Sequence, residues 1–222
     1  MSTYVLMRIL ESAPRRYELG IRILTFGRLD RAYDRLVSRV ERGQRVLDIG
    51  CGTGAFTLRA ARRGAKVKGI DVNPEMLEIA EQRVRGAGLA ESVELVEMGV
   101  AELGGEEAQS YDAVLSGLCL SELSDDEVKY TLKEIWRILR PGGLMLVADE
   151  IRPQRLGDRF IHTLLRAPLA AITYVVTQQT TRPVSELPEK LSAGGFVIVS
   201  AHLTGLGSFG EFVAQKPAEN AS

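Results

Sequence analysis

Short apolar runs alternate with amphipathic stretches through the middle of the chain. The apolar runs are too short for helices and predict strands, over residues 46–49, 66–71, 93–97 and 111–118. The stretches between and after them place apolar residues at helical spacing, over about 53–63, 75–85 and 125–139. Strands that alternate with helices in this way predict a parallel sheet with helices on both faces.

The C-terminal part continues this pattern and then changes it. A fifth strand over 144–148 follows the turn Arg140-Pro141-Gly142-Gly143, and a short helix over 184–193 ends at Gly194-Gly195. Two closing strands, 196–203 and 208–215, come next without a helix between them. The apolar run 160–176 contains His162, Arg166 and Pro168, so it is no membrane span. We interpret it as one broken or two short helices inserted after the fifth strand.

The N-terminal segment is amphipathic and basic. It holds ten arginines and no lysine by residue 45, against five acidic residues. Its apolar positions recur at helical spacing and predict a helix that ends near Gly43, with a buried face of Leu29, Tyr33, Leu36, Val37 and Val40. We favour a helix that covers one face of the sheet over a membrane surface or a surface for an anionic partner.

Composition limits the remaining possibilities. The chain has 222 residues, 45% of them hydrophobic, and 28 basic against 29 acidic residues, which is typical of a soluble globular domain and does not indicate nucleic acid as a partner. Its start lacks a secretory signal pattern, so we expect a cytoplasmic protein. Cys51 and Cys119 predict neither a disulfide nor a metal site. The oligomeric state cannot be read from the sequence.

A glycine-rich turn follows the first strand and carries the most specific pattern, Asp48-x-Gly50-x-Gly52-x-Gly54, with Cys51 inside it. Glycine reaches backbone angles closed to other residues and lets a ligand approach the main chain, so we expect a ligand on this turn. A carboxylate two residues before the first glycine would repel a pyrophosphate, but could accept from an amino group or a water.

This motif resembles the first motif of class I S-adenosylmethionine-dependent methyltransferases, and the ordered strands up to about residue 150 support the resemblance. It implies a Rossmann-like α/β sheet of seven strands in the order 3-2-1-4-5-7-6, the last antiparallel, with S-adenosylmethionine as cofactor and S-adenosylhomocysteine as product. Asp71 ends the second strand about 20 residues beyond the turn, where an acid holds a ribose diol in such folds. Val72 and Met76 would then lie beside the adenine, although packing in the hydrophobic core is nearly as compatible with both.

The resemblance also assigns roles at the next two strands. Position 100 is often an aspartate in similar methyltransferases, whereas this chain has valine, so we expect Gly99, Val100 and Ala101 to read the adenine through backbone groups. Ser116 and Gly117, at the end of the fourth strand, are candidate contacts of the methionine part. Catalytic candidates are Glu150, just past the fifth strand, and His162. A structural role competes with each, since Glu150 could pair with Arg152 and a lone histidine in an amphipathic segment is more often structural.

The chain is similar to the ubiquinone and menaquinone biosynthesis group, which implies that the N-terminal segment caps the cofactor, with Tyr17 and Tyr33 as lid candidates. A fainter resemblance to corrinoid protein-associated methyltransferases suggests a corrinoid protein as partner. We therefore expect a methyltransferase for a small, apolar acceptor or a partner protein's ligand. The alternatives are a non-catalytic cofactor-binding sensor and an NAD-dependent oxidoreductase. The expected organisation is a helical cap over 1–43, a methyltransferase domain over 44–216 with an insertion at about 150–182, and a disordered tail over 217–222.

Overall fold

A seven-stranded sheet forms the centre of the computed structural model, which describes residues 28–151, 184–204 and 209–218. The strands are β1 (Arg45–Ile49), β2 (Lys66–Asp71), β3 (Val93–Glu97), β4 (Tyr111–Gly117), β5 (Leu139–Glu150), β6 (Val197–Thr204) and β7 (Phe209–Gln215). Their order is β3-β2-β1-β4-β5-β7-β6, and β7 runs antiparallel to both of its neighbours. The predicted strand order and the antiparallel last strand are confirmed.

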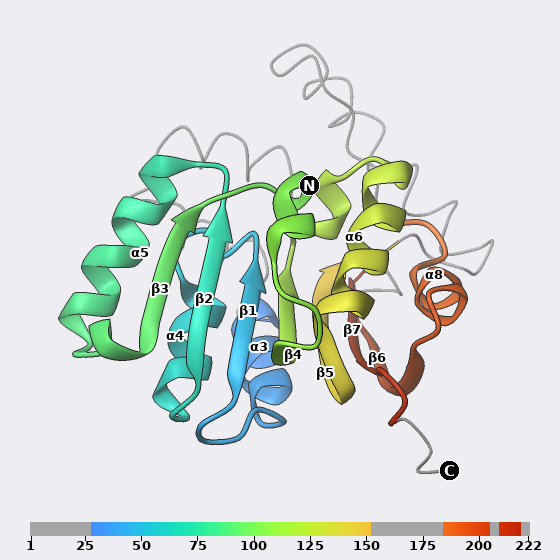
Figure 1. Ribbon diagram of the computed structural model, residues 1–222, viewed down its shortest axis with the longest axis horizontal. Coiled ribbons are helices and arrows are strands. Elements are labelled where there is room, and N and C mark those ends of the chain that lie inside the picture. The colour runs from blue at the N-terminus through green and yellow to red at the C-terminus, as the bar shows by residue number, and fades with distance from the viewer. Residues whose placement is uncertain (1–27, 152–183, 205–208, 219–222) are drawn as a thin grey trace.

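Helices cover both faces of this sheet (Figure 1). Behind it, in the view of Figure 1, lie α3 (Arg28–Val37) and α4 (Ala55–Arg62), and in front of it lies α6 (Asp125–Ile138). The 3-10 helix η2 (Val100–Gly105) and α8 (Leu187–Ala193) share the side of α6. Helix α5 (Pro74–Gly86) packs along β2 and β3, and the short 3-10 helices η1 (Ala90–Ser92) and η3 (Leu120–Glu122) complete the connections.

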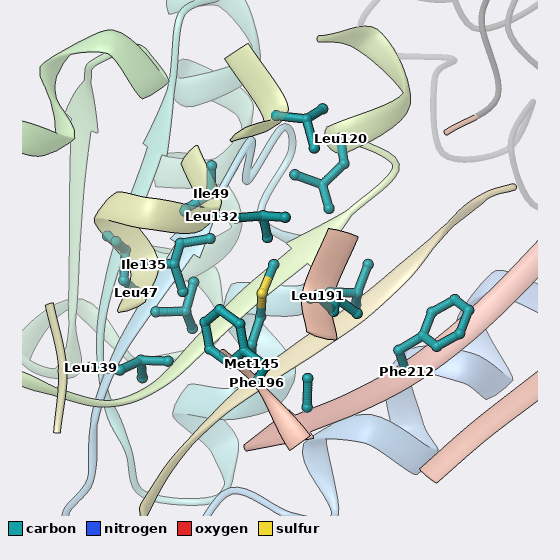
Figure 2. Packing of buried hydrophobic residues seen from close by; sticks show 14 of the residues in the cluster. Leu47, Ile49, Leu120, Leu132, Ile135, Leu139, Met145, Leu191, Phe196 and Phe212 are labelled. Carbon is teal, nitrogen blue, oxygen red and sulfur yellow. The ribbon is translucent and has the colours of Figure 1, made fainter. Parts of the chain in front are cut away.

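The two faces bury separate hydrophobic clusters, because successive strand residues point to opposite sides. Figure 2 shows the α6 side, where Leu132 and Ile135 meet Leu47 and Ile49 of β1. On the α3 side, the ring of Tyr33 stacks on that of Phe56 with centroids 4.1 Å apart. All five apolar residues predicted to face inward from the N-terminal helix are buried.

Several boundaries differ from the sequence expectations, and helix α8 begins at Leu187, three residues later than predicted. Helix α3 ends at Val37, not near Gly43, and hydrogen bonds from the amides of Arg39 and Val40 back to Leu36 and Val37 close the chain into a turn. Strand β5 begins at Leu139, so the expected Pro-Gly-Gly turn is an irregular part of the strand, where its register against β4 shifts. Strand β6 begins one residue later than predicted.

Several predictions fall outside the described residues. They concern the N-terminal cap before residue 28 with Tyr17, the insertion over 152–182 with His162, and the end of the tail. The division into cap, domain, insertion and tail stays a prediction. Within the described ranges, no helix is both long enough and apolar enough to cross a membrane.

Candidate cofactor site

The glycine turn between β1 and α4 requires glycine for two different reasons. Gly50, Gly52 and Gly54 have φ of +66°, +52° and +77°, in the left-handed region that favours glycine. A Cβ on Gly50 would collide with Cys119 at 2.7 Å, and one on Gly54 would lie 3.2 Å from the Cβ of Ala80. A Cβ on Gly52 would meet nothing within 4 Å. Gly50 and Gly54 therefore serve packing, whereas Gly52 leaves space open above the main chain.

That space belongs to a cavity of ≈ 460 Å³ at the carboxyl ends of the parallel strands. Nine of the thirteen predicted cofactor residues line it: Gly50, Gly52, Asp71, Val72, Met76, Gly99, Val100, Ala101 and Gly117. Val72 is 71% exposed although it is a large apolar residue, and it lies on the cavity wall. An exposed apolar side chain within a concave surface is typical of a ligand contact.

Asp71 lies at the centre of this wall and is fixed by backbone donors. Its Oδ2 accepts from the amide of Gly52 at 2.8 Å and its Oδ1 from that of Asn73 at 2.9 Å, while burial raises its pKa. The cap of α5 is a separate residue, because Asn73 Oδ1 accepts from the amide of Glu75 at 3.0 Å. A carboxylate has about four acceptor sites, so the two oxygens of Asp71 retain capacity for the hydroxyls of a ribose.

Four predicted residues lie beside the cavity and do not line it. Asp48 faces α4, where its Oδ2 accepts from Thr57 Oγ1 at 2.6 Å, and burial raises its pKa to about 7. Cys51 points toward β2, where a Cβ on Gly69 would lie 3.1 Å from its Sγ, and burial raises the thiol pKa. The Oγ of Ser116 is buried and has no hydrogen-bond partner within the described part of the chain. The fourth is Gly54, at the start of α4.

One wall of the cavity consists of residues that the sequence patterns did not predict. The segment from Leu118 to Leu123 contributes several lining residues, and the amide of Leu118 donates to the carbonyl of Ala148 at 2.9 Å. The full set of lining residues not predicted is Ile49, Ile70, Asn73, Met98, Leu118, Cys119, Glu122, Leu123 and Glu127. Two of them carried a local signal, since Asn73 caps α5 and Glu127 forms the capping box of α6 with Ser124.

The catalytic candidates divide between described and undescribed residues. Glu150 is half-buried at the end of β5 and does not line the cavity, and His162 lies outside the described ranges. The neighbouring Asp149 is fully buried, accepts from the amides of Ser121 and Glu150 at 3.3 and 2.7 Å, and has its pKa raised to about 7 by burial. A carboxyl with a pKa near neutrality has the property expected of a general base.

The lid candidate Tyr33 is packed beneath the site. It is buried on α3, and a Cβ on Gly117 would overlap its hydroxyl, so glycine at position 117 makes room for the ring. Within the described ranges, no group of three or more His, Cys, Asp or Glu residues is arranged to hold a metal ion.

Comparisons with known proteins agree with this geometry. Residues 46–143 match the model of a methyltransferase domain. The chain is 31% identical over 172 residues to an uncharacterized methyltransferase of Synechocystis, which covers 75% of this chain and 73% of that protein. It is 33% identical over 139 residues to the demethylmenaquinone methyltransferase of Tropheryma whipplei, which covers 62% of this chain and 55% of the relative. The chain thus spans about half the length of that relative.

Solved structures share the fold at lower identity. Magnesium protoporphyrin IX methyltransferase from Synechocystis, solved with bound S-adenosylmethionine, superposes with a TM-score of 0.63 at 19% identity and covers 88% of this chain and 81% of that one. The cyclase SpnF gives a TM-score of 0.69 at 23% identity, with 86% and 81% covered. The domain match and the Synechocystis relative, together with the glycine turn and strand order, show that the chain belongs to the class I S-adenosylmethionine-dependent methyltransferase family.

Proposed function

We propose that the chain transfers the methyl group of S-adenosylmethionine to a small, apolar acceptor. One observation carries the proposal: the cavity at the strand ends combines the open space above Gly52 with the carboxylate of Asp71 and the exposed face of Val72. These three features suit the close approach of a ligand to the main chain, a ribose and an apolar base, in that order along the wall.

The placement of the cofactor follows from the position of Asp71. With the ribose on this carboxylate, the adenine lies over the ends of β2 and β3, between Val72 and Met76 and the backbone of residues 99–101. The methionine part lies over the glycine turn toward Gly117. Asp48, Cys51, Gly54 and Ser116 support this half from behind, without lining the cavity.

The charge of the wall argues against a dinucleotide. The acidic lining residues are Asp71, Glu122 and Glu127, and no lysine or arginine is among the described lining residues. A pyrophosphate is usually held by backbone donors and cations, and the amide of Gly52 is already bonded to Asp71. This arrangement favours a sulfonium cofactor over NAD.

The reaction requires alignment more than acid–base chemistry. The bound cofactor supplies a methyl group already activated by its positive sulfur. The chain has to hold the acceptor behind that carbon and exclude water, and such alignment contributes about 7–11 kcal/mol to a bimolecular step. For an acceptor that loses a proton, we propose a carboxyl at the end of β5, Asp149 or Glu150, or else His162, as the base.

The nature of the acceptor is suggested by the relatives. Those named as demethylmenaquinone methyltransferase and as ubiquinone/menaquinone biosynthesis C-methyltransferase are 33% and 29% identical to this chain. Apolar residues of the wall near the methyl site, Leu118 and Leu123, fit an acceptor with a hydrophobic ring. A corrinoid protein as partner stays a prediction.

A transfer assay tests the proposal. Purified protein would be incubated with S-adenosylmethionine labelled on the methyl group and a panel of small quinols, phenols and apolar amines, with label in each acceptor measured after extraction. We expect transfer to at least one apolar acceptor, and none in the Gly52→Val variant. Binding of the cofactor without transfer to any acceptor would contradict the enzyme assignment and favour the cofactor-binding sensor.

A further inference from the structure

The edge strand β6 carries a group of exposed apolar side chains that the cofactor site does not explain. Within the described ranges five large hydrophobic residues are exposed, and three of them lie on this strand: Val197 at 55%, Val199 at 46% and Leu203 at 51%. The other two have contacts that account for them, because Val72 lines the cavity and the hydroxyl of Tyr130 donates to a carbonyl of η2 at 3.2 Å. Apolar side chains gathered on one exposed element are typical of a surface that binds another protein.

The same strand offers backbone groups for pairing. β6 is the last strand in the sheet order, and β7 is its one neighbour among the described strands. On its outer side, the N–H and C=O groups that alternate along an edge strand face away from the sheet. Another β-strand satisfies such a row of donors and acceptors in regular order. The partner that fits this surface is therefore an extended segment with apolar side chains.

The two edges of the sheet differ in charge (Figure 1). The opposite edge strand, β3, carries Glu94 and Glu97, and both are exposed. Charged side chains on an edge strand oppose pairing with a second copy of the same strand. β6 has the sequence Val-Ile-Val-Ser-Ala-His-Leu-Thr, with no aspartate, glutamate, lysine or arginine. Two copies of β3 would therefore repel each other, whereas two copies of β6 would not.

The register of β6 suits pairing with a second copy of itself. A two-fold axis perpendicular to the sheet makes the two β6 strands antiparallel, and β7 already runs antiparallel to β6, so the pattern continues across the axis. After a shift in register near its start, the strand pairs with β7 without interruption over Ser200–Thr204. With Ala201 on the axis, Val199 lies opposite Leu203 of the second copy, because each is two residues from Ala201.

The described flanks of segment 152–183 lie away from the start of β6. Ile151 and Val184 form a bridge at the carboxyl end of β5, so this segment leaves and re-enters the described chain at one end of the sheet. β6 reaches that end with Thr204, whereas its start at Val197 lies at the opposite end. A second copy is therefore a better candidate for the whole length of β6 than the chain's own segment.

We infer that the protein forms a homodimer in which the two β6 strands pair edge to edge across a two-fold axis and join the two sheets into one. The antiparallel pairing places the two cofactor cavities at opposite edges of the joint sheet, so neither copy covers the cavity of the other. The contact is closed at two copies, and the charged β3 strands become the outer edges. The inference is independent of the proposed function, because it uses no residue of the cavity.

Sedimentation velocity from about 2 to about 200 µM protein tests the inference on the unmodified chain. We expect the mass to shift with concentration from one chain of 24.3 kDa toward two chains. The dissociation constant should lie in the micromolar range, because a single strand pair makes a small interface. A mass of one chain at every concentration would overturn the inference.

Amide hydrogen exchange on the same samples locates the contact. Peptides that cover β6 should exchange more slowly at the higher concentration, and peptides that cover β3 should not change. Slow exchange of β6 at both concentrations in a protein with the mass of one chain would assign the edge to segment 152–183 and overturn the inference. Exchange of β6 that does not slow as the dimer forms would place the contact elsewhere and also overturn it.

Two lysine variants separate the two edges of the sheet. Val199 is half-exposed and pairs with no residue of β7, so Val199→Lys adds a charge to the β6 edge without removing a contact between the strands. We expect the dimer to weaken by about tenfold or more. Glu94→Lys places the same side chain on β3 and should leave the dissociation constant within about twofold. Equal effects of the two variants, or no effect of Val199→Lys, would contradict pairing through β6. Should Val199→Lys fail to fold, the exchange experiment on the unmodified protein decides.

Discussion

Replacing Gly52 by valine separates the cost of backbone strain from the loss of ligand space. Valine is disfavoured at this position, because φ is +52° and its side chain is branched at Cβ. The substitution therefore lowers the stability of the fold by about 1–2 kcal/mol. No protein atom lies within 4 Å of the new Cβ, so the fold itself has room for it. A ligand that lies on the turn has no room for the valine side chain. Overpacking of this kind weakens the free energy of binding by about 1–3 kcal/mol, which corresponds to roughly 5- to 150-fold weaker binding.

Gly88 supplies the matched control. It has φ of +69°, and its Cβ would also meet nothing within 4 Å, but it lies after α5 and does not line the cavity. Gly88→Val should therefore lose similar stability in urea unfolding and bind S-adenosylhomocysteine within twofold of the unmodified protein. Equal affinity of the two variants in calorimetric titration would refute the placement of the cofactor on the turn.

Three further predictions concern single charged side chains. Asp71→Asn exchanges a charged acceptor for a neutral amide, and calorimetry should record about 10- to 150-fold weaker binding of S-adenosylhomocysteine; a change under twofold would exclude the ribose role. Burial raises the pKa of Asp48 from 3.8 to about 7, so its contribution to stability is fully present below about pH 4 and is lost as the pH rises through 7. Asp48→Asn should thus reduce the fall in unfolding free energy between pH 5 and 8 by up to about 3 kcal/mol in urea titrations, and an unaltered fall would contradict this assignment. Arg35→Gln removes the guanidinium whose Nε donates to Glu211 at 2.9 Å, so that buried carboxylate loses its cation. The free energy of unfolding should fall by about 1–3 kcal/mol. Unchanged stability would show that the pair is not needed to hold α3 on β7.

The strand order could be predicted because local pattern and sheet architecture agree. Short apolar runs separated by amphipathic helices leave few arrangements once parallel strands are assumed, and the glycine turn marks the first strand. The same consistency explains why the helices over 75–85 and 125–139 were predicted close to their observed starts, since the capping side chains of Asn73 and Ser124 act on their own neighbours in sequence.

The missing part of the site depends on long-range contacts. Glu122 and Leu123 line the cavity because the segment after β4 is tied to the end of β5, and no local pattern encodes that tie. Glu150 was predicted as a candidate and Asp149 was not. Both faces of β5 are covered, so the alternation of apolar and polar side chains along the strand does not show which of the two acids is buried. Only the packing of η3 against the end of β5 distinguishes them.

The most direct test of the central claim is a calorimetric titration of the protein with S-adenosylhomocysteine and, separately, with NAD. The site described above predicts micromolar binding of the first ligand, with one molecule per chain, and no detectable heat of binding for the second. Failure to bind S-adenosylhomocysteine, or binding of NAD in its place, would contradict the assignment of this cavity to a methyl-transfer cofactor.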